Sequence, residues 1–188
     1  MALKLSEDVI NQIKDFPKPN YLKDYPFYDH LTQEQKSLID ELIPNEELRE
    51  RYKNHGLCKE CSQPNTGSYI DYGWCQSCNS KHFQQDFNKW TSGNKEIDEF
   101  IQKFQLNATR YQEVLEWIPY EKFSNIEYLA KGGFGSVHKA FWIDGCIQYW
   151  DINQTKWNRD KYYSNIVLKC LNDSQNLTTD FLQEVCSL

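Results

Sequence analysis

Four cysteines in two closely spaced pairs constrain the fold of this chain more than any other sequence feature. They occur as Cys58-x-x-Cys61 and Cys75-x-x-Cys78, with 13 residues between the pairs. Each C-x-x-C turn places two thiolates on one side of a tight bend, and two such turns complete a tetrahedron of sulfur ligands. Zinc favours this arrangement. Because all four positions are cysteine, the pattern predicts a structural zinc site with no open coordination position.

Two disulfides, a redox-active pair or four unrelated thiols are alternatives for the same cysteines. Disulfides fit a reducing compartment poorly, and the surrounding sequence does not indicate a thioredoxin-like unit. The chain has three further cysteines, which we expect to be ordinary buried thiols: Cys146, Cys170 and Cys186.

Length and composition limit the classes of function. The 188 residues suffice for one ordinary domain or two small ones, and the net charge of −6 argues against a nucleic-acid-binding surface. No apolar run approaches the roughly 18 residues of a membrane span, and the first residues become charged too early for a secretory signal. We therefore expect neither nucleic acid nor a membrane among the partners, and a location in the cytosol or nucleus.

Amphipathic patterns and cap residues predict short helices before residue 123. We expect a helical region over residues 1–56, a zinc-binding hairpin and helix over 57–93, and a helical linker over 94–122. In the linker, Tyr111, Val114, Leu115 and Ile118 form an apolar stripe that Pro119 ends. The expected helix-capping residues are Ser6, Thr32 with Gln35, Asn45, Ser80 and Asn94.

The pattern changes to strands from Phe123 onwards. Expected strands at 123–129 and 136–143 flank a glycine-rich turn, and 148–151 and 162–171 continue the sheet. Asp144-Gly145 is a hairpin-turn signal, and the polar segment 151–161 is expected to be a long surface loop. The glycine turn is either a plain hairpin or an anion site, because glycines let backbone N–H groups approach phosphate oxygens. Its glycines are Gly132, Gly133 and Gly135.

A lysine and a glutamate follow the glycine turn at informative positions. Lys169 ends an apolar, β-branched strand, and Glu184 lies in a helical pattern that begins near Leu177. A glycine loop, a strand lysine and a helix glutamate form, in this order, a cradle for nucleotide phosphates. An exposed ion pair between the two side chains is the simpler alternative.

These features together resemble the amino-terminal lobe of a protein kinase, over residues 123–188. The tyrosine-kinase-like branch of the Ser/Thr type, as in lineage-expanded fungal kinase sets, is the most similar. Ala130 replaces the first glycine of the family's loop, and Val167 stands where alanine is usual. The residues that match the loop and the lysine strand are Leu129, Gly132, Phe134, Gly135, Val137, Ala140, Ile166, Leu168 and Lys169.

The resemblance implies an α+β fold, in which a helical and four-cysteine zinc-hairpin region precedes the antiparallel-sheet small lobe of a kinase, truncated after its first helix. It also implies ATP with Mg²⁺ as cofactor, and protein substrates or signalling partners. Lys169 would bind the α and β phosphates, and Glu184 would orient Lys169. The remaining nucleotide contacts would come from Leu129, Ala130, Lys131, Gly132, Gly133, Phe134, Gly135, Ser136, Val137 and Val167.

Phosphoryl transfer needs further residues that the sequence does not contain. No histidine is followed by Arg-Asp, and no Asp-Phe-Gly occurs. We therefore expect this chain by itself to bind nucleotide without catalysing transfer. The alternatives are a non-catalytic, truncated kinase relative that acts by binding, and a zinc-ribbon interaction module with an unrelated glycine hairpin.

Overall fold

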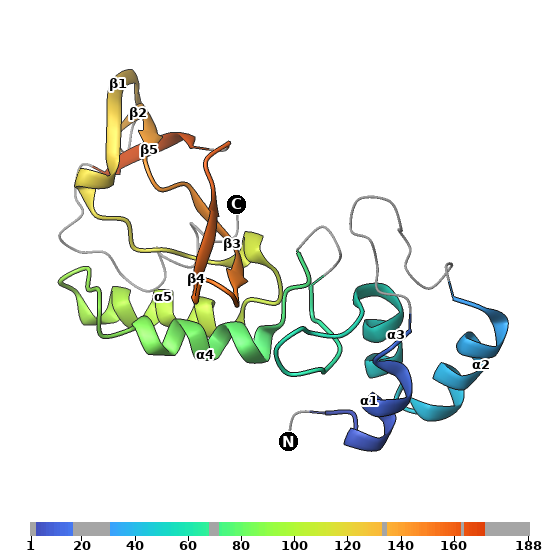
Figure 1. Ribbon diagram of the computed structural model, residues 1–188. Helices are drawn as coiled ribbons and strands as arrows, with labels where there is room; N and C mark the ends of the chain where they lie inside the picture. Colours follow the sequence, from blue (N-terminus) through green and yellow to red (C-terminus); the bar gives the residue numbers. More distant parts are fainter. Residues whose placement is uncertain (1–2, 17–30, 68–71, 133–134, 163, 172–188) are drawn as a thin grey trace.

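The computed structural model describes residues 3–16, 31–67, 72–132, 135–162 and 164–171, and within them the chain is α+β (Figure 1). Along these residues, no helix combines the length and apolar character that crossing a membrane requires. The helices are α1 (Glu7–Ile13), α2 (Gln33–Leu42), α3 (Glu46–His55), α4 (Gln76–Asp86) and α5 (Lys95–Asn107). The strands are β1 (Phe123–Gly132), β2 (Gly135–Trp142), β3 (Cys146–Asp151), β4 (Lys156–Asp160) and β5 (Asn165–Leu171).

The first three helices begin at the residues that their caps predict. The Thr32 hydroxyl accepts from the backbone N–H of Gln35, and the Gln35 side chain accepts from the backbone N–H of Thr32, so the capping box is confirmed. Ser6 and Asn45 cap α1 and α3 in the predicted way. These caps satisfy N–H groups that a helix terminus otherwise leaves unpaired.

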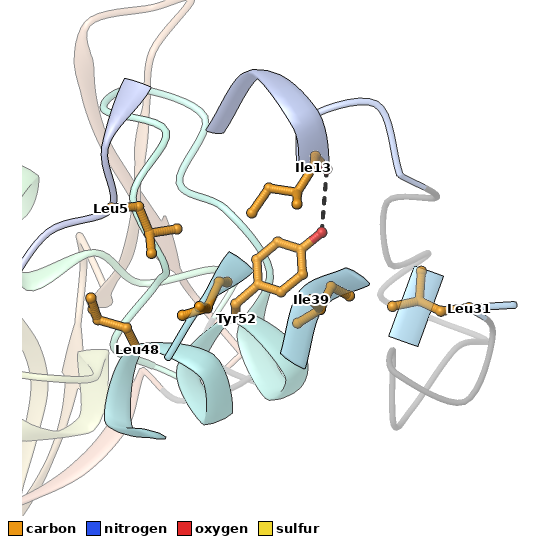
Figure 2. Close-up of a cluster of buried hydrophobic side chains, with 7 residues drawn as sticks. Leu5, Ile13, Leu31, Ile39, Leu48 and Tyr52 are labelled. Carbon is orange, nitrogen blue, oxygen red and sulfur yellow. Dashed lines mark hydrogen bonds between the residues drawn. The ribbon is translucent and has the colours of Figure 1, made fainter. Parts of the chain in front are cut away.

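Helices α1, α2 and α3 enclose a hydrophobic core of their own. Tyr52 lies at its centre, and its hydroxyl donates to the backbone carbonyl of Ile13 at 3.3 Å (Figure 2). This bond ties α3 to the end of α1. Burial raises the pKa of the Tyr52 hydroxyl, so the hydroxyl keeps its proton and remains a donor. The other buried members of the core are Leu5, Leu31, Ile39, Ile43 and Leu48.

A second core joins helix α4 to the β3–β4 hairpin. Trp74 is fully buried, and its indole N–H donates to the carbonyl of Ala108 at 2.9 Å. The ring of Trp157 on β4 stacks on Phe83 at 4.3 Å and on Trp74 at 5.9 Å. Ile147 on β3 completes the buried cluster. This core therefore depends on residues that lie far apart in the chain.

The strands form two separate sheets, which corrects the expectation of one continuous sheet. One sheet has the antiparallel order β1-β2-β5, and the other consists of β3 and β4 alone. The polar segment 151–161 is not the expected loop, since it contains β4, whose Trp157 packs on Phe83. Asp144-Gly145 connects the two sheets and makes no hairpin, since β2 and β3 are not paired.

Two helix predictions are also wrong. Residues 111–118 form only a short 3-10 turn at Tyr111–Glu113, because the carbonyl of Leu115 accepts from the side-chain amide of Gln105. The predicted Ser80 cap is not used either. Helix α4 begins at Gln76 directly after Cys75, so the second cysteine pair lies on the first turn of α4.

A mostly buried ion pair fastens the linker to the β3–β4 hairpin. The guanidinium of Arg159 on β4 bonds to the carboxylate of Glu116, which also accepts from the backbone N–H of Ile147 at 3.1 Å. Arg159 donates further to the carbonyl of Gly145 at 2.7 Å. Burial raises the pKa of Glu116, and the charge of Arg159 opposes this shift.

We predict that Glu116→Ala lowers the free energy of unfolding by about 2–3 kcal/mol, because the charge of Arg159 would lose the carboxylate that balances it. Urea denaturation measures the change. Glu99→Ala is the matched control, since Glu99 pairs with Lys95 on an exposed surface of α5 and should cost at most about 0.5 kcal/mol. Equal losses for the two variants would contradict the structural role of Glu116.

Candidate metal centre and glycine-turn sheet

The structure brings the four paired cysteines together. The sulfur atoms of Cys58, Cys61, Cys75 and Cys78 all lie within 4.8 Å of one another. The Cys58–Cys78 and Cys61–Cys75 sulfur distances are 3.8 and 3.7 Å. A tetrahedral ion with metal–sulfur bonds of about 2.3 Å needs sulfur–sulfur distances of about 3.8 Å. This cluster can therefore hold a metal ion such as zinc.

The first cysteine pair is shaped by a tight turn. The backbone N–H of Ser62 donates to the carbonyl of Cys58 at 3.0 Å, and the N–H of Cys58 donates to the carbonyl of Gln63 at 2.8 Å. Ser62 has a φ of 56°, a left-handed conformation that lets the chain reverse within this turn. Both thiols consequently lie on the inner side of the bend.

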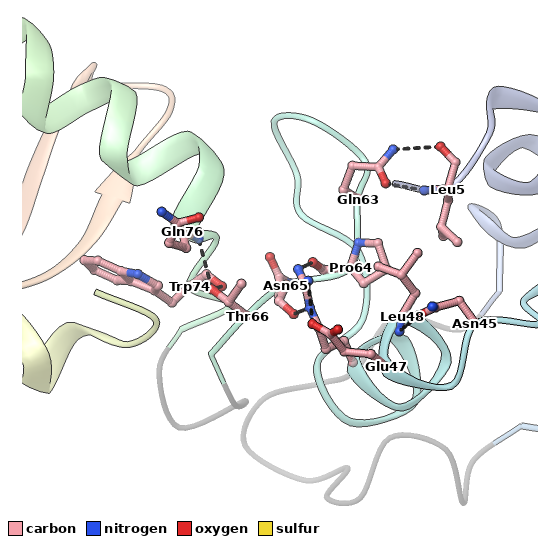
Figure 3. Close-up of polar contacts among 11 residues, drawn as sticks. Leu5, Asn45, Glu47, Leu48, Gln63, Pro64, Asn65, Thr66, Trp74 and Gln76 are labelled. Carbon is pink, nitrogen blue, oxygen red and sulfur yellow. Dashed lines mark hydrogen bonds and ion pairs between the residues drawn. The ribbon is translucent and has the colours of Figure 1, made fainter. Parts of the chain in front are cut away.

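The second pair is held by the start of helix α4. Cys75 is the N-cap residue and Cys78 lies in the first turn. The hydroxyl of Thr66 accepts from the backbone N–H of Gln76 at 2.9 Å, which supplies the cap that the Cys75 side chain does not (Figure 3). Thr66 also donates to the carbonyl of Trp74 at 3.2 Å. The metal centre and the second core therefore share one backbone segment.

The first cysteine turn is fastened to the three-helix core. The side-chain amide of Gln63 makes two hydrogen bonds with the backbone of Leu5, at 2.7 and 3.1 Å (Figure 3). Arg51 on α3 donates to the carbonyls of Pro64 and Asn65. The cysteine cluster thus lies between the two hydrophobic cores.

Close packing of the four sulfurs shifts the pKa values of their thiols in opposite directions. Hydrogen bonding to Cys58, and then to Cys75 and Cys78, lowers the pKa of Cys61. The same contacts with Cys58 and Cys61 raise the pKa of Cys75 and of Cys78. Metal binding needs all four sulfurs as thiolates, so it would release the protons that the cluster still carries.

The β3–β4 hairpin packs against the metal-bearing helix α4. The ring of Trp150 stacks on His82 at 3.9 Å, and the imidazole of His82 bonds to the carboxylate of Glu60 at 2.8 Å. Trp150 and Trp157 are direct cross-strand partners, so both rings leave the same face of the hairpin. Sequence reasoning missed this contact, although two tryptophans that flank a polar turn are a readable signal of a hairpin.

The predicted glycine turn joins β1 and β2. Gly132 pairs with Gly135 at the end of the β1–β2 ladder, while Gly133 and Phe134 lie outside the described residues. A Cβ on Gly135 would lie 1.9 Å from the carbonyl oxygen of Cys170. Glycine is therefore required at position 135, because β5 passes directly against it.

The predicted lysine lies across the sheet from Val137, two residues after Gly135 of the glycine turn. Val137 on β2 and Lys169 on β5 are direct antiparallel partners, and Lys139 pairs with Val167 two residues further along. Direct partners project from the same face, and on this face Val167 is 65% exposed. Leu129, Ala130 and Lys131 are exposed on β1, and Ser136 is half-buried on β2.

Other predicted residues are not brought into this group. Glu184 and Cys186 lie outside the described residues, so the pairing of Glu184 with Lys169 stays a prediction. Cys170 is exposed and Cys146 is only half-buried, which corrects the expectation that both are buried thiols. Cys170 shares a face of β5 with the half-buried Leu168, but it is the last residue but one of the strand, where the alternation of exposed and half-buried residues breaks.

Comparison of the chain with protein-family models, with curated proteins and with solved structures gave no match. What the chain does is therefore inferred from its own residues.

We predict that the purified chain binds about one Zn²⁺ and that Cys78→Ser lowers the metal content several-fold, since a hydroxyl is a poor replacement for a thiolate. Elemental analysis of the dialysed protein measures this. Cys170→Ser is the matched control. It should retain the metal, because Cys170 lies on β5 and is not one of the four clustered cysteines. A wild-type protein that takes up no metal would refute the assignment.

Proposed function

We propose that residues 123–188 are the ATP-binding small lobe of a protein kinase and that Cys58, Cys61, Cys75 and Cys78 hold a structural zinc. The observation that carries the nucleotide proposal is the register of β2 and β5. Lys169 lies directly across from Val137, two residues after Gly135 of the glycine turn. A cation at this position of the ladder supports the proposal that the glycine turn receives phosphate.

The exposed face of the β1-β2-β5 sheet has the composition that a nucleotide needs. Val137 and Val167 offer apolar surface for a purine, and Lys169 on the same face offers a positive charge for the α and β phosphates. Ala130 is the cross-strand partner of Val137 on β1, so this face continues across all three strands. Mg²⁺ would accompany the triphosphate, as the chemistry of ATP requires.

The proposal for this chain is nucleotide binding. Phosphoryl transfer to protein hydroxyls belongs to a complete kinase domain, because a catalytic aspartate and metal-binding residues must be positioned around the γ phosphate. Glu184 is the proposed partner of Lys169, since an acidic side chain would hold the ammonium in place beneath the phosphates.

The zinc is proposed as a structural element. Four thiolate ligands leave no position for a substrate, and the cluster lies where the backbone passes from the first core to the second. Metal binding would therefore stabilise the arrangement of α4, on which the β3–β4 hairpin packs.

A non-catalytic binding role is the second candidate. The exposed large side chains on the three-stranded sheet favour it, because apolar groups of this kind mark protein-binding surfaces. They are Tyr128, Leu129 and Val167. Tyr128 is the partner of His138 and so projects from the face opposite Val167. In this case the sheet would contact another protein and Lys169 would have no special role.

Substitution of the lysine distinguishes the two candidates. We expect Lys169→Met to weaken binding of ATP with Mg²⁺ about tenfold, because the cation on the phosphate side is lost while the side-chain length is kept. Isothermal titration calorimetry on the full chain measures the affinity. Lys156→Met is the matched control on the separate β3–β4 sheet and should bind like wild type. If Lys169→Met and wild type bind ATP equally, the nucleotide assignment is wrong.

A further inference from the structure

A cavity of about 590 Å³ lies between the first cysteine turn and the end of strand β3. It is bounded on one side by Lys59 and Glu60 of the cysteine turn, and on the other by the last residues of β3 and the turn that follows. The side chains at its rim include Tyr72 and Ile152, which are 48% and 47% exposed. The volume is within the usual range of ligand pockets.

The walls of the cavity contain aromatic rings that are held in place. Tyr72 and Tyr149 contact each other with ring centroids 5.2 Å apart. The ring of Trp150 is stacked on His82 at 3.9 Å, and the ring of Trp157 contacts Trp150 edge-on at 5.2 Å. Rings fixed by such contacts lose little further conformational freedom when a ligand binds.

The charges around the cavity are predominantly negative. Cys58, Cys75 and Cys78 line it, and the proposed zinc ion with four thiolate ligands would retain a net negative charge. Glu60 and Asp151 add two carboxylates, of which that of Glu60 is bonded to the imidazole of His82. Among the described lining residues Lys59 is the one basic residue. The carboxylate of Asp151 accepts from the backbone N–H groups of Asn153 at 2.9 Å and Gln154 at 3.0 Å, which holds it in position.

We propose that this cavity binds a segment of a partner protein through an arginine side chain. A guanidinium can stack on an aromatic ring and bond to a carboxylate at the same time, which matches a cavity lined by Tyr149 and Asp151, two residues on the same face of β3. The exposed Tyr72 and Ile152 at the rim supply apolar contacts for the residues that flank the arginine. The site is separate from the sheet face of Lys169 and does not depend on nucleotide.

A short peptide on the zinc-loaded full chain tests the proposal. The probe is the blocked heptapeptide Gly-Leu-Gly-Arg-Gly-Leu-Gly, and the comparison peptide has glutamine in place of arginine. We expect calorimetry to detect binding of the arginine peptide and at least about fivefold weaker binding of the glutamine peptide, since the cation contacts are lost.

Two variants with opposite expected effects locate the site. Asp151→Asn should weaken binding of the arginine peptide about fivefold, whereas Lys59→Gln should strengthen it about twofold because a like charge is removed. Asp144→Asn is the matched control, because it removes the same charge from the connection between the sheets, where Asp144 pairs with Lys122. It should leave the affinity unchanged.

Several results would overturn the proposal. These are equal affinities for the arginine and glutamine peptides, no detectable binding of either, or equal losses for Asp151→Asn and Asp144→Asn. Zinc content and circular dichroism of each variant show whether it folds. If Asp151→Asn does not fold, Lys59→Gln decides, and unchanged or weaker binding by this variant refutes the site. ATP is left out of all titrations, so that failure here is distinct from failure of the nucleotide proposal.

Discussion

The meeting of four sulfur atoms at one point is the constraint on which the rest of the structure depends. It joins two turns separated by 13 residues and sets where helix α4 begins. One turn is bonded to Leu5 and to α3, and the other leads from Trp74 into the second core. Both hydrophobic cores are small. A metal ion bound between them would therefore contribute much of the stability with which they are held together.

The β3–β4 hairpin extends this order towards the glycine turn. It lies in the chain between β2 and β5, and in Figure 1 it lies between helix α4 and the three-stranded sheet. Trp157 packs on α4 and Arg159 bonds to Glu116, so two residues of β4 hold the hairpin in place. The strand that carries Lys169 leaves this hairpin after only four residues. The position of the exposed sheet face therefore depends on the hairpin, which in turn packs on the cysteine-bearing helix α4.

The sequence predicts the features that depend on neighbouring residues and fails where distant contacts decide. The cysteine cluster and the Thr32–Gln35 cap follow from local spacing, and both are present in the structure. Strand β4 resembles a loop in sequence because most of its residues are polar. Its one large apolar residue, Trp157, packs on Trp74 and Phe83, which lie far earlier in the chain. The stripe that begins at Tyr111 has helical spacing, but hydrogen bonds from Gln105 to Leu115 and from Arg159 to Glu116 hold most of the segment in a non-helical form. The Lys169–Glu184 pair depends on a residue outside the described part of the chain.

The stacking of indole rings across the second core gives this molecule an optical signature of its own. Trp74 and Trp157 lie 5.9 Å apart with an angle of 21° between their planes, and they come from opposite sides of the contact between α4 and the hairpin. Two chromophores this close couple their electronic transitions, so the near-ultraviolet spectrum reports their mutual orientation. Separation of the hairpin from the helix is therefore visible spectroscopically without any added label.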